Sequence, residues 1–531
     1  MKRNPDALKN THFDLLVIGG GIYGVWSAFD AALRGLKVAL IEKKDWASAT
    51  SSSSSKLIHG GFRYLENLRF GLVKKSLKER KLLNKLAPHQ VRPLTFLLPL
   101  YKAYRLPPWE LKAGLFLYDM LAGKNQPVKR HSSMNPRETL KRYPFLKPEG
   151  LLGTLTYGDC GTDDARFVTE LVAGAIKAGV VAVNYVEALE LLSESHQIVG
   201  AKVLDTCAGE TFEIRAAATL NAAGPWIGDL IGDHSFSSTF RLDKGVHLLL
   251  PGLPTGKAML IISRSDDRIF FMIPWYGKTL VGTTDTDYSG DPDKVAVSEA
   301  DIDYLLEETR KVIINPQWDR SSILGKFAGL RTLIQQPGKS ASKATREWSL
   351  LNPKAGLFVS VGGKFTSARV DAESIIDQIL PTLPSKQTVA STTSSTPFPW
   401  SPGDEYKIWK DEMLEQGVGY GFHQEMFSFT LERFGTSIES ILDLARNDPS
   451  LAELIHPDLP FFKAELVHCA TSEMVIHLED LLRRRIPLTI LSTLDLESLQ
   501  WITKLIAPVL GWDQQRQEEE ISTLFTAGEI Q

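Results

Sequence analysis

Three glycines near the start of the chain, Gly19, Gly21 and Gly24, have the G-x-G-x-x-G spacing that brings a peptide backbone close to a phosphate group. The first permits a tight turn, the second lets the backbone approach a pyrophosphate, and the third lets a helix pack closely on a strand. The helix N-terminus would direct N–H groups and a positive dipole at the phosphates. Glu42, eighteen residues beyond Gly24, would accept hydrogen bonds from ribose hydroxyls. These residues predict a dinucleotide site but do not separate a flavin from a nicotinamide dinucleotide.

A strand, a helix and a second strand must position these glycines. Residues 15–18 and 38–41 are short apolar runs, and residues 25–33 between them have a helical pattern. Together they predict one βαβ unit of a parallel sheet. Further β-like runs recur at residues 198–203, 218–221, 247–250, 269–273 and 357–361. The middle of the chain is therefore expected to mix α and β structure.

Longer motifs make the chain similar to a known family. Residues 49–65, ATSSSSSKLIHGGFRYL, resemble the signature of the FAD-dependent, aerobic-type glycerol-3-phosphate dehydrogenases. The resemblance extends to the motifs YGDCGTDDAR, NAAGPW, KGVH, GTTDTDYSGDP and GGKFTS. It is strong over residues 14–380 and weak in the tail. It implies an α/β fold in which a Rossmann-like FAD-binding domain is interleaved with an α+β substrate domain carrying a mixed sheet, followed by an all-α C-terminal domain.

The expected domain boundaries follow from this resemblance and from composition. Residues 1–387 would form the FAD-binding domain and its interleaved cap, with FAD segments at about 14–70, 150–230 and 325–385. Residues 388–402, TVASTTSSTPFPWSP, are rich in Ser, Thr and Pro and predict a linker.

The remaining residues, 403–531, are expected to be helical. Apolar side chains at three- and four-residue spacing predict an amphipathic helix over residues 462–482. The consecutive Arg483, Arg484 and Arg485 are expected to cap a helix.

The resemblance implies FAD as the cofactor, because in this family the Ser/Thr-rich segment after the second strand wraps the flavin. The Gly-Gly-Lys segment would aim backbone N–H groups at the flavin N1 and C2 carbonyl, where negative charge collects on reduction. Besides the glycine turn and Glu42, the implied cofactor positions are Thr50, Ser51, Ser55, Lys56, Leu57, Val186, Gly224, Gly362, Gly363 and Lys364.

A phosphorylated polyol needs cationic donors for its dianion and one base for the hydroxyl that is oxidised. By resemblance, the residues that would bind phosphate and polyol are Arg63, Tyr64, Arg346, Lys364 and Thr366. His247 would take the proton of the secondary hydroxyl, since histidine has a reference pKa of about 6.5. Arg331 would stabilise the developing alkoxide while hydride passes to the flavin. Glycerol 3-phosphate would thus become dihydroxyacetone phosphate.

Several points stay open at this stage. The family commonly has a proline after the arginine at position 331, whereas this chain has Thr332, so the loop carrying Arg331 would be set differently. The acceptor implied by resemblance is a quinone. The alternatives are an oxidase that passes electrons to oxygen, an amine or 2-hydroxy acid oxidase of the same superfamily, and a flavoprotein that has become an assembly module.

A basic segment points to a membrane surface. Residues 63–130 contain fifteen Lys or Arg and only four acidic residues, in a chain of net charge −3. The apolar runs 94–101 and 115–118 within it are typical of segments that lie in an anionic membrane interface. The alternative is a solvated basic helix over residues 74–85. We therefore expect peripheral attachment to the inner face of the cell membrane, where reduced flavin would meet quinone.

The 531 residues, 43% hydrophobic and 23% charged, indicate a folded globular protein of two or more domains. The three cysteines, Cys160, Cys207 and Cys469, lack metal-ligand spacing and predict a reducing compartment, so no metal is expected. The N-terminal residues do not form a signal peptide, which predicts a cytoplasmic protein. No nucleic-acid recognition motif accompanies the basic segment. The oligomeric state is left open, a homodimer included.

Overall fold

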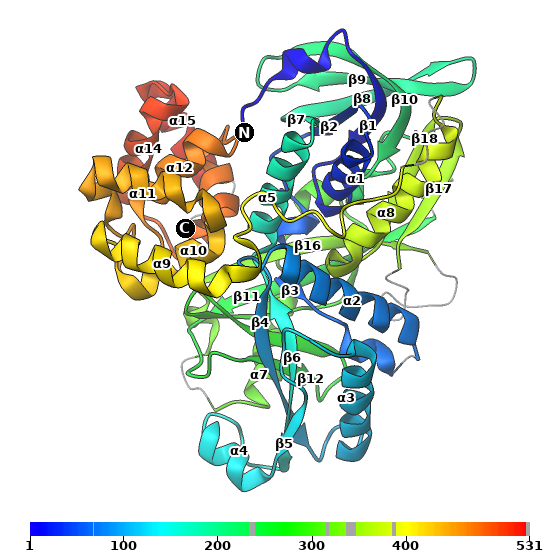
Figure 1. The fold of residues 1–531 in the computed structure, drawn as a ribbon. Helices are drawn as coiled ribbons and strands as arrows, with labels where there is room; N and C mark the ends of the chain where they lie inside the picture. Colours follow the sequence, from blue (N-terminus) through cyan, green and yellow to red (C-terminus); the bar gives the residue numbers. More distant parts are fainter. Residues whose placement is uncertain (67, 233–238, 315–317, 336–346, 385–388, 527–531) are drawn as a thin grey trace.

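Two β-sheets and a helical C-terminal region make up the computed structural model (Figure 1). It describes residues 1–531 except 67, 233–238, 315–317, 336–346, 385–388 and 527–531. In Figure 1 the first sheet lies in the upper half, the second in the lower half, and the helical region packs at one side, near the N-terminus. None of the described helices is long and apolar enough to cross a membrane.

The first sheet is built around the expected βαβ unit. Its path is β17-β18-β10-β1-β2-β7, and the β8–β9 hairpin extends it through β10. The strands β7, β2, β1, β10 and β18 run parallel. The bounds of its strands are β1 (His12–Ile18), β2 (Val38–Glu42), β7 (Val181–Asn184), β8 (Val186–Glu194), β9 (Gln197–Asp205), β10 (Glu210–Asn221), β17 (Ser349–Lys354) and β18 (Leu357–Val361).

Side chains alternate between the two faces of this sheet. Leu15 and Val17 pack under the helices α1 (Ile22–Leu33), α5 (Asp164–Lys177) and α8 (Ala368–Ile379). Leu16 and Ile18 instead join the cluster that includes residues of the β8–β9 hairpin. Strands buried on both faces explain the nearly continuous apolar runs in the sequence.

The second sheet contains the expected substrate domain and mixes parallel and antiparallel pairs. Its path is β15-β11-β14-β13-β12-β4-β6-β3, with β16 paired to β11 and β5 paired to β6. The bounds of its strands are β3 (Leu57–Ile58), β4 (Arg92–Tyr101), β5 (Ser132–Met134), β6 (Leu151–Gly161), β11 (Phe240–Leu250), β12 (Ala258–Ile262), β13 (Ile269–Trp275), β14 (Lys278–Gly282), β15 (Thr286–Tyr288) and β16 (Gly325–Ile334).

Two of the expected FAD segments begin with strands of the second sheet. The strands β6 and β16 open the segments 150–230 and 325–385, which we assigned to the FAD-binding domain, yet both pair within the second sheet. Their alternating apolar patterns do not say which sheet completes them, because strand pairing is decided by distant partners. Helices of this half are α2 (Phe70–Leu86), α3 (Pro108–Ala122), α4 (Pro136–Arg142) and α7 (Glu299–Arg310).

The structure disagrees with one part of the membrane interpretation of the basic segment, the apolar run of residues 94–101. Residues 94–101 lie in β4, whose last six residues, 96–101, are all buried in the sheet. Most of this run is therefore core and not membrane-facing surface. In α3, Leu115 and Tyr118 are also buried, whereas Phe116 is 64% exposed.

The segment predicted as a linker has no regular helix or strand in its described part but is packed along the first domain. Thr393 bonds to Arg369, and Ser391 bonds to Asp30. Phe398 is buried against Trp26 and Phe167. The Ser, Thr and Pro composition thus reflects side-chain anchoring of an irregular backbone and not a free tether.

The C-terminal region is helical, as expected. Its helices are α9 (Tyr406–Gly419), α10 (Gln424–Phe434), α11 (Ile438–Asn447), α12 (Lys463–Ser472), a π-helix (Asp480–Arg485), α13 (Leu488–Leu491), α14 (Leu496–Leu510) and α15 (Gln514–Thr526). The single helix predicted over residues 462–482 is wrong. α12 ends at Ser472, and Met474 has a left-handed φ of 55°, which interrupts the helix.

The arginine triplet lies in the last turn of the π-helix, and two of its members, Arg484 and Arg485, are buried. The guanidinium nitrogens of both residues donate to the carboxylate oxygens of Asp45, which follows β2, at 2.6 to 2.8 Å. Burial opposes ionisation of Asp45, but Arg485 and Arg484 outweigh it and lower the pKa of this carboxyl. Removing one partner of a buried ion pair typically costs about 3–5 kcal/mol. These residues therefore attach the helical region to the half of the molecule that is built on the first sheet.

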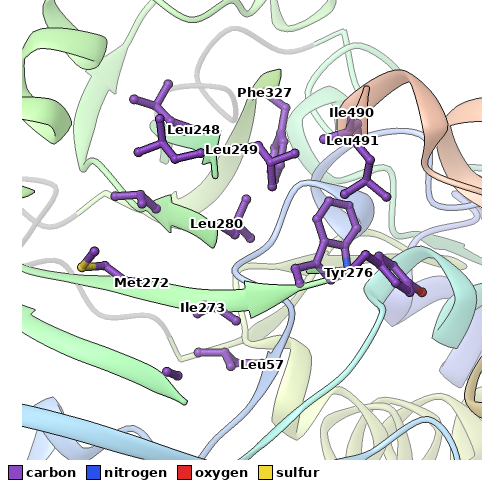
Figure 2. Packing of buried hydrophobic residues seen from close by; sticks show 14 of the residues in the cluster. Leu57, Leu248, Leu249, Met272, Ile273, Tyr276, Leu280, Phe327, Ile490 and Leu491 are labelled. Atoms are coloured by element: carbon purple, nitrogen blue, oxygen red, sulfur yellow. The ribbon is translucent and has the colours of Figure 1, made fainter. Parts of the chain in front are cut away.

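Apolar packing continues this attachment into the second sheet. Figure 2 shows Ile490 and Leu491 of α13 beside Leu249 of β11 and Phe327 of β16. A Cβ placed on Gly325 would lie 2.0 Å from the carbonyl oxygen of Ile490, so the two backbones are in close contact. The helical region thus supports β11 and β16, the strands that carry the two predicted catalytic residues.

Candidate active site

A cavity of about 510 Å³ lies between the two sheets. Its walls come from the glycine turn, the Ser/Thr-rich segment, the start of β8, the residues after β10, and the strands β11 and β16. Of the predicted positions, those that line it are Gly19, Gly21, Glu42, Thr50, Ser51, Ser55, Leu57, Arg63, Tyr64, Val186, Gly224, His247, Arg331, Gly362, Gly363, Lys364 and Thr366. Segments from most of the first 366 residues therefore line the same cavity.

The glycine turn has the geometry that its sequence predicts. Gly19 has φ of 115°, and a Cβ there would lie 2.6 Å from the carbonyl oxygen of Ala222. A Cβ on Gly24 would lie 1.9 Å from the carbonyl oxygen of Gly19, so the helix packs directly on the turn. Gly21 precedes α1, and the next N–H, that of Ile22, donates to the hydroxyl of Ser51. The N-terminus of α1 thus faces the cavity.

Glu42 ends β2 beside this turn. Its carboxylate accepts hydrogen bonds from the N–H groups of Gly20 at 2.6 Å and Lys44 at 2.9 Å. Burial raises the pKa of Glu42, while the two N–H groups lower it. The side chain is held at the cavity wall, with further acceptor capacity on each oxygen for ribose hydroxyls.

The Ser/Thr-rich segment places most of its predicted residues at the cavity, but Lys56 differs. The Thr50 hydroxyl donates to the carbonyl of Leu330, which ties this segment to β16. Lys56 is 3% exposed and its Nζ pairs with Asp164 at 2.5 Å. This side chain does not line the cavity, so any contact of Lys56 with a cofactor would have to come from its backbone.

The Gly-Gly-Lys segment forms another wall. Gly362 and Gly363 have φ of 76° and 104°, and a Cβ on Gly363 would lie 1.9 Å from the hydroxyl of Tyr23. That hydroxyl accepts from the N–H of Lys364 and donates to Asp371 at 2.6 Å. Tyr23 thereby fixes the segment. It lies between Gly21 and Gly24, so its place in the glycine motif was the signal that sequence reasoning overlooked.

His247 and Arg331 come together because their strands are antiparallel neighbours. In the β11–β16 register Asp243 faces Arg331 and His247 faces Phe327. A Cβ on Gly245 would lie 2.4 Å from the Arg331 guanidinium, and one on Gly282 would lie 2.4 Å from the His247 ring. These two glycines leave the space that both side chains occupy.

The His247 ring is buried and neutral. Burial lowers its pKa well below the usual value, and the positive charges of Arg331 and Lys56 lower it further. Its Nε2 lies 2.9 Å from the Ser55 hydroxyl, and the ring stacks on Phe327 with centroids 5.0 Å apart. Within the described residues Nδ1 has no hydrogen-bond partner. A neutral, oriented imidazole can accept a proton at neutral pH.

The Arg331 guanidinium is held by oxygen atoms on several sides. It donates to Asp243 at 2.6 Å, to Asp285 at 2.9 Å and to the Thr283 hydroxyl at 2.9 Å. Sequence reasoning did not assign these three residues, although Thr283 and Asp285 lie in the GTTDTDYSGDP motif. Thr332 is part of β16, opposite Leu242, so Arg331 stands on a strand and not on the loop that we expected.

The remaining cations converge near the same end of the cavity. The Lys364 Nζ lies 3.5 Å from the centroid of the Tyr64 ring, and the Arg63 guanidinium lies 4.0 Å from Asp285. The hydroxyl of Thr366 accepts from the N–H of His59. Arg346 lies outside the described residues.

The cavity fits FAD on these observations. The close glycine contacts and the N-terminus of α1 suit a pyrophosphate, and Glu42 suits a ribose. The glycines at 362 and 363 let backbone approach a flat ring at the other end. When bound, FAD supplies a two-electron acceptor for hydride.

Comparisons with known proteins agree with this assignment. The family model for FAD dependent oxidoreductases matches residues 14–365, and the model for the C-terminal domain of alpha-glycerophosphate oxidase matches residues 396–517. The chain is 36% identical over 529 residues to glycerol-3-phosphate dehydrogenase 2 of Mycobacterium tuberculosis, covering 99% of this chain and 89% of the relative. It is 33% identical over 490 residues to an aerobic glycerol-3-phosphate dehydrogenase of Staphylococcus aureus, covering 90% and 87%.

A solved structure extends the likeness to the whole fold. The glycerol-3-phosphate dehydrogenase from Bacillus halodurans, complexed with FAD, is 26% identical with a TM-score of 0.78, covering 98% of this chain and 95% of that one. The overall fold, with its helical C-terminal region, is thus shared with a protein that binds FAD. Since both family models and near full-length relatives agree with the geometry, the chain belongs to the FAD-dependent glycerol-3-phosphate dehydrogenase family.

Proposed function

We propose that this protein oxidises the secondary hydroxyl of sn-glycerol 3-phosphate to give dihydroxyacetone phosphate and passes the electrons to a quinone. The observation that carries the proposal is the pairing of a neutral buried base, His247, with a fixed cation, Arg331, on adjacent strands facing one cavity. The names of the dehydrogenase relatives support the choice of substrate.

His247 and Arg331 have different roles in the proposed reaction. His247 accepts the proton of the hydroxyl, and the Ser55 hydroxyl at 2.9 Å keeps the imidazole oriented. Arg331 stabilises the negative charge that develops on that oxygen, and Asp243 and Asp285 prevent the guanidinium from swinging away.

The phosphate dianion is bound at the cationic wall of the cavity. Arg63 and Lys364 supply positive charge there, and Tyr64 and Thr366 add hydroxyl groups. Two cations and two hydroxyls suit a dianionic phosphate better than the single carboxylate of an amino acid or a 2-hydroxy acid. This distribution of charge favours the polyol phosphate over the amine and 2-hydroxy acid alternatives.

Attachment to an anionic membrane would bring the protein to its quinone. The outward face of α3 carries Trp109, Phe116 and Met120, which are 69%, 64% and 61% exposed. Lys112 is exposed on the same face, at three- and four-residue spacing from its apolar neighbours. Apolar and basic groups on one exposed helix face are the pattern of an interfacial helix.

Anaerobic mixing with sn-glycerol 3-phosphate tests the substrate, since bleaching of the flavin absorbance reports its reduction directly. We expect complete bleaching, whereas D-amino acids and 2-hydroxy acids should leave the flavin oxidised. Absence of bleaching by glycerol 3-phosphate would refute the proposed substrate. Reoxidation by a quinone analogue much faster than by dissolved oxygen is expected of a dehydrogenase, and the opposite order would make the protein an oxidase.

Sedimentation with vesicles tests the membrane surface. Vesicles containing phosphatidylglycerol should carry the protein down at low salt, and less so in high salt because ions screen the attraction. Neutral phosphatidylcholine vesicles are the control. No binding to anionic vesicles at low salt would refute the attachment.

A further inference from the structure

A second cavity of about 490 Å³ lies beside the reacting end of the flavin cavity. Helix α3, the strands β12 and β13, and residues 62, 63, 65, 66, 68 and 70 line it. Its walls are largely apolar, with Phe62, Leu65, Leu117, Leu260 and Ile262 among them. The catalytic steps described above use none of these five side chains.

The charged side chains at the rim of this second cavity are mostly acidic. Glu66, Arg105, Glu110 and Asp267 are all exposed. Arg105 pairs with Glu66 and also lies 3.7 Å from Asp267. An apolar interior with an excess of acidic side chains at the rim disfavours a phosphate dianion and suits an uncharged ring.

Position makes the second cavity suitable for electron transfer. Arg63 and Ile269 line both cavities, so only their side chains and those of immediate neighbours separate the two spaces. A ring bound there would be close to the flavin without displacing the polyol from His247 and Arg331.

The mouth of the second cavity opens onto apolar surface. Leu68 and Phe70, at the mouth, are 72% and 40% exposed. Ala113, on α3, is also exposed and lines the opening. The outward apolar stripe of the same helix adjoins this region, so the opening faces the surface that we assign to the membrane. An apolar tail can therefore remain in lipid while its ring enters the protein.

We propose that this second cavity binds the quinone, separately from the polyol phosphate; the inference rests on the proposed function. The quinone gains two electrons from the reduced flavin and two protons, one from the reduced flavin and one from solvent. It leaves as the quinol, and the flavin returns to its oxidised form. Substrate and acceptor thus use different openings and need not exchange places during turnover.

Narrowing the second cavity tests the assignment, with decylubiquinone as the probe. Ala113→Phe fills the mouth and Leu117→Trp fills the interior, each in the full-length FAD-loaded enzyme. The matched control is Ala122→Phe, the same substitution on the same helix at a residue that does not line the cavity. Three rates are measured: anaerobic flavin reduction by glycerol 3-phosphate, reoxidation by decylubiquinone, and turnover with ferricyanide.

Both narrowing variants should lower the rate of reoxidation by decylubiquinone at least tenfold. Flavin reduction and ferricyanide turnover should stay within twofold of the wild type, and the control should match the wild type in all three rates. Unchanged reoxidation in both variants would overturn the inference, as would an equal loss of flavin reduction in both. If the unmodified enzyme is not reduced by glycerol 3-phosphate or not reoxidised by decylubiquinone, the proposed function itself fails, and the two failures are distinguishable.

Discussion

The two ends of the flavin cavity are built in different ways. The dinucleotide end uses backbone atoms and glycines from one short stretch, in which Gly19, Gly24 and Glu42 belong to a single βαβ unit. The reacting end uses polar side chains from separate strands, the neutral His247 on β11 and the cationic Arg331 on β16. The turn predicted to receive the pyrophosphate is thus a local property of the chain, whereas the predicted catalytic pair depends on long-range strand pairing. Substitutions at the two ends should therefore separate loss of FAD from loss of rate.

The largest effect is expected at the dinucleotide end, from Gly24→Ala. The new methyl group would lie 1.9 Å from the carbonyl oxygen of Gly19, so α1 cannot keep its place on the turn. We expect FAD to be lost during gel filtration, measured as the ratio of 450 nm to 280 nm absorbance. Gly419→Ala, where nothing lies within 4 Å of the added Cβ, is the matched control. Full FAD retention by Gly24→Ala would show that the turn does not depend on this contact.

His247→Asn should give the opposite result, an enzyme that keeps FAD but reduces it slowly. Loss of a general base typically lowers a rate by about 10²–10⁴-fold. Stopped-flow bleaching of the flavin under anaerobic conditions measures this step. An unchanged rate would remove His247 as the base.

The pH dependence of flavin reduction tests the same residue. Because the pKa of His247 is lowered, its ring is neutral and active through neutral pH, down to well below its usual value of 6.5. The rate in the wild type should therefore hold as pH falls through 6.5 and decline only in more acidic buffer. A decline centred at 6.5 or above would contradict the burial of this ring.

Arg331→Lys should have a smaller effect at the reacting end. Lysine keeps the positive charge but cannot reproduce the fork that contacts Asp243, Asp285 and Thr283 together. We expect kcat/KM to fall by about ten- to a hundredfold, in line with one lost charge-assisted hydrogen bond of about 1.5–3 kcal/mol. FAD content should not change. Loss of FAD here would mean that the two ends are coupled.

Glu42→Gln is expected to have the smallest effect. The amide oxygen can still accept from Gly20, but the charge that strengthens hydrogen bonds from ribose hydroxyls is gone. FAD affinity should weaken by about tenfold or less, as for roughly 1 kcal/mol. Fluorescence titration of the FAD-free protein measures it. A total loss of FAD would show that Glu42 holds the turn itself together.

The contrast between the two ends also explains what the sequence could predict. The βαβ unit was recognisable because its glycines, strands and acid lie within 29 residues and each has a local reason. The sheet to which β6 and β16 belong could not be recognised from the sequence, because their partner strands lie far away along the chain. Likewise Arg331 could be named by resemblance, but the carboxylates that hold it appear only when β11, β15 and β16 are assembled.

The other differences between prediction and structure concern residues that are buried. The apolar run of residues 94–101 has the composition of an interfacial segment, and only its central place in the second sheet identifies it as core. The arginine triplet was expected only to cap a helix, whereas two of its members form buried ion pairs with Asp45. Composition cannot distinguish these cases, because a distant partner decides each of them.

The attachment of the tail to Asp45 has a consequence for synthesis on the ribosome. Asp45 and Arg166 are both buried, and their countercharges Arg485 and Glu473 belong to the last quarter of the chain. The amino group of Met1 likewise bonds to the carbonyl of Ser472. During synthesis, Asp45 and Arg166 therefore lack these countercharges until almost the whole polypeptide has emerged. A chain stopped near residue 400 would therefore leave a flavin-binding half that cannot complete its own interior.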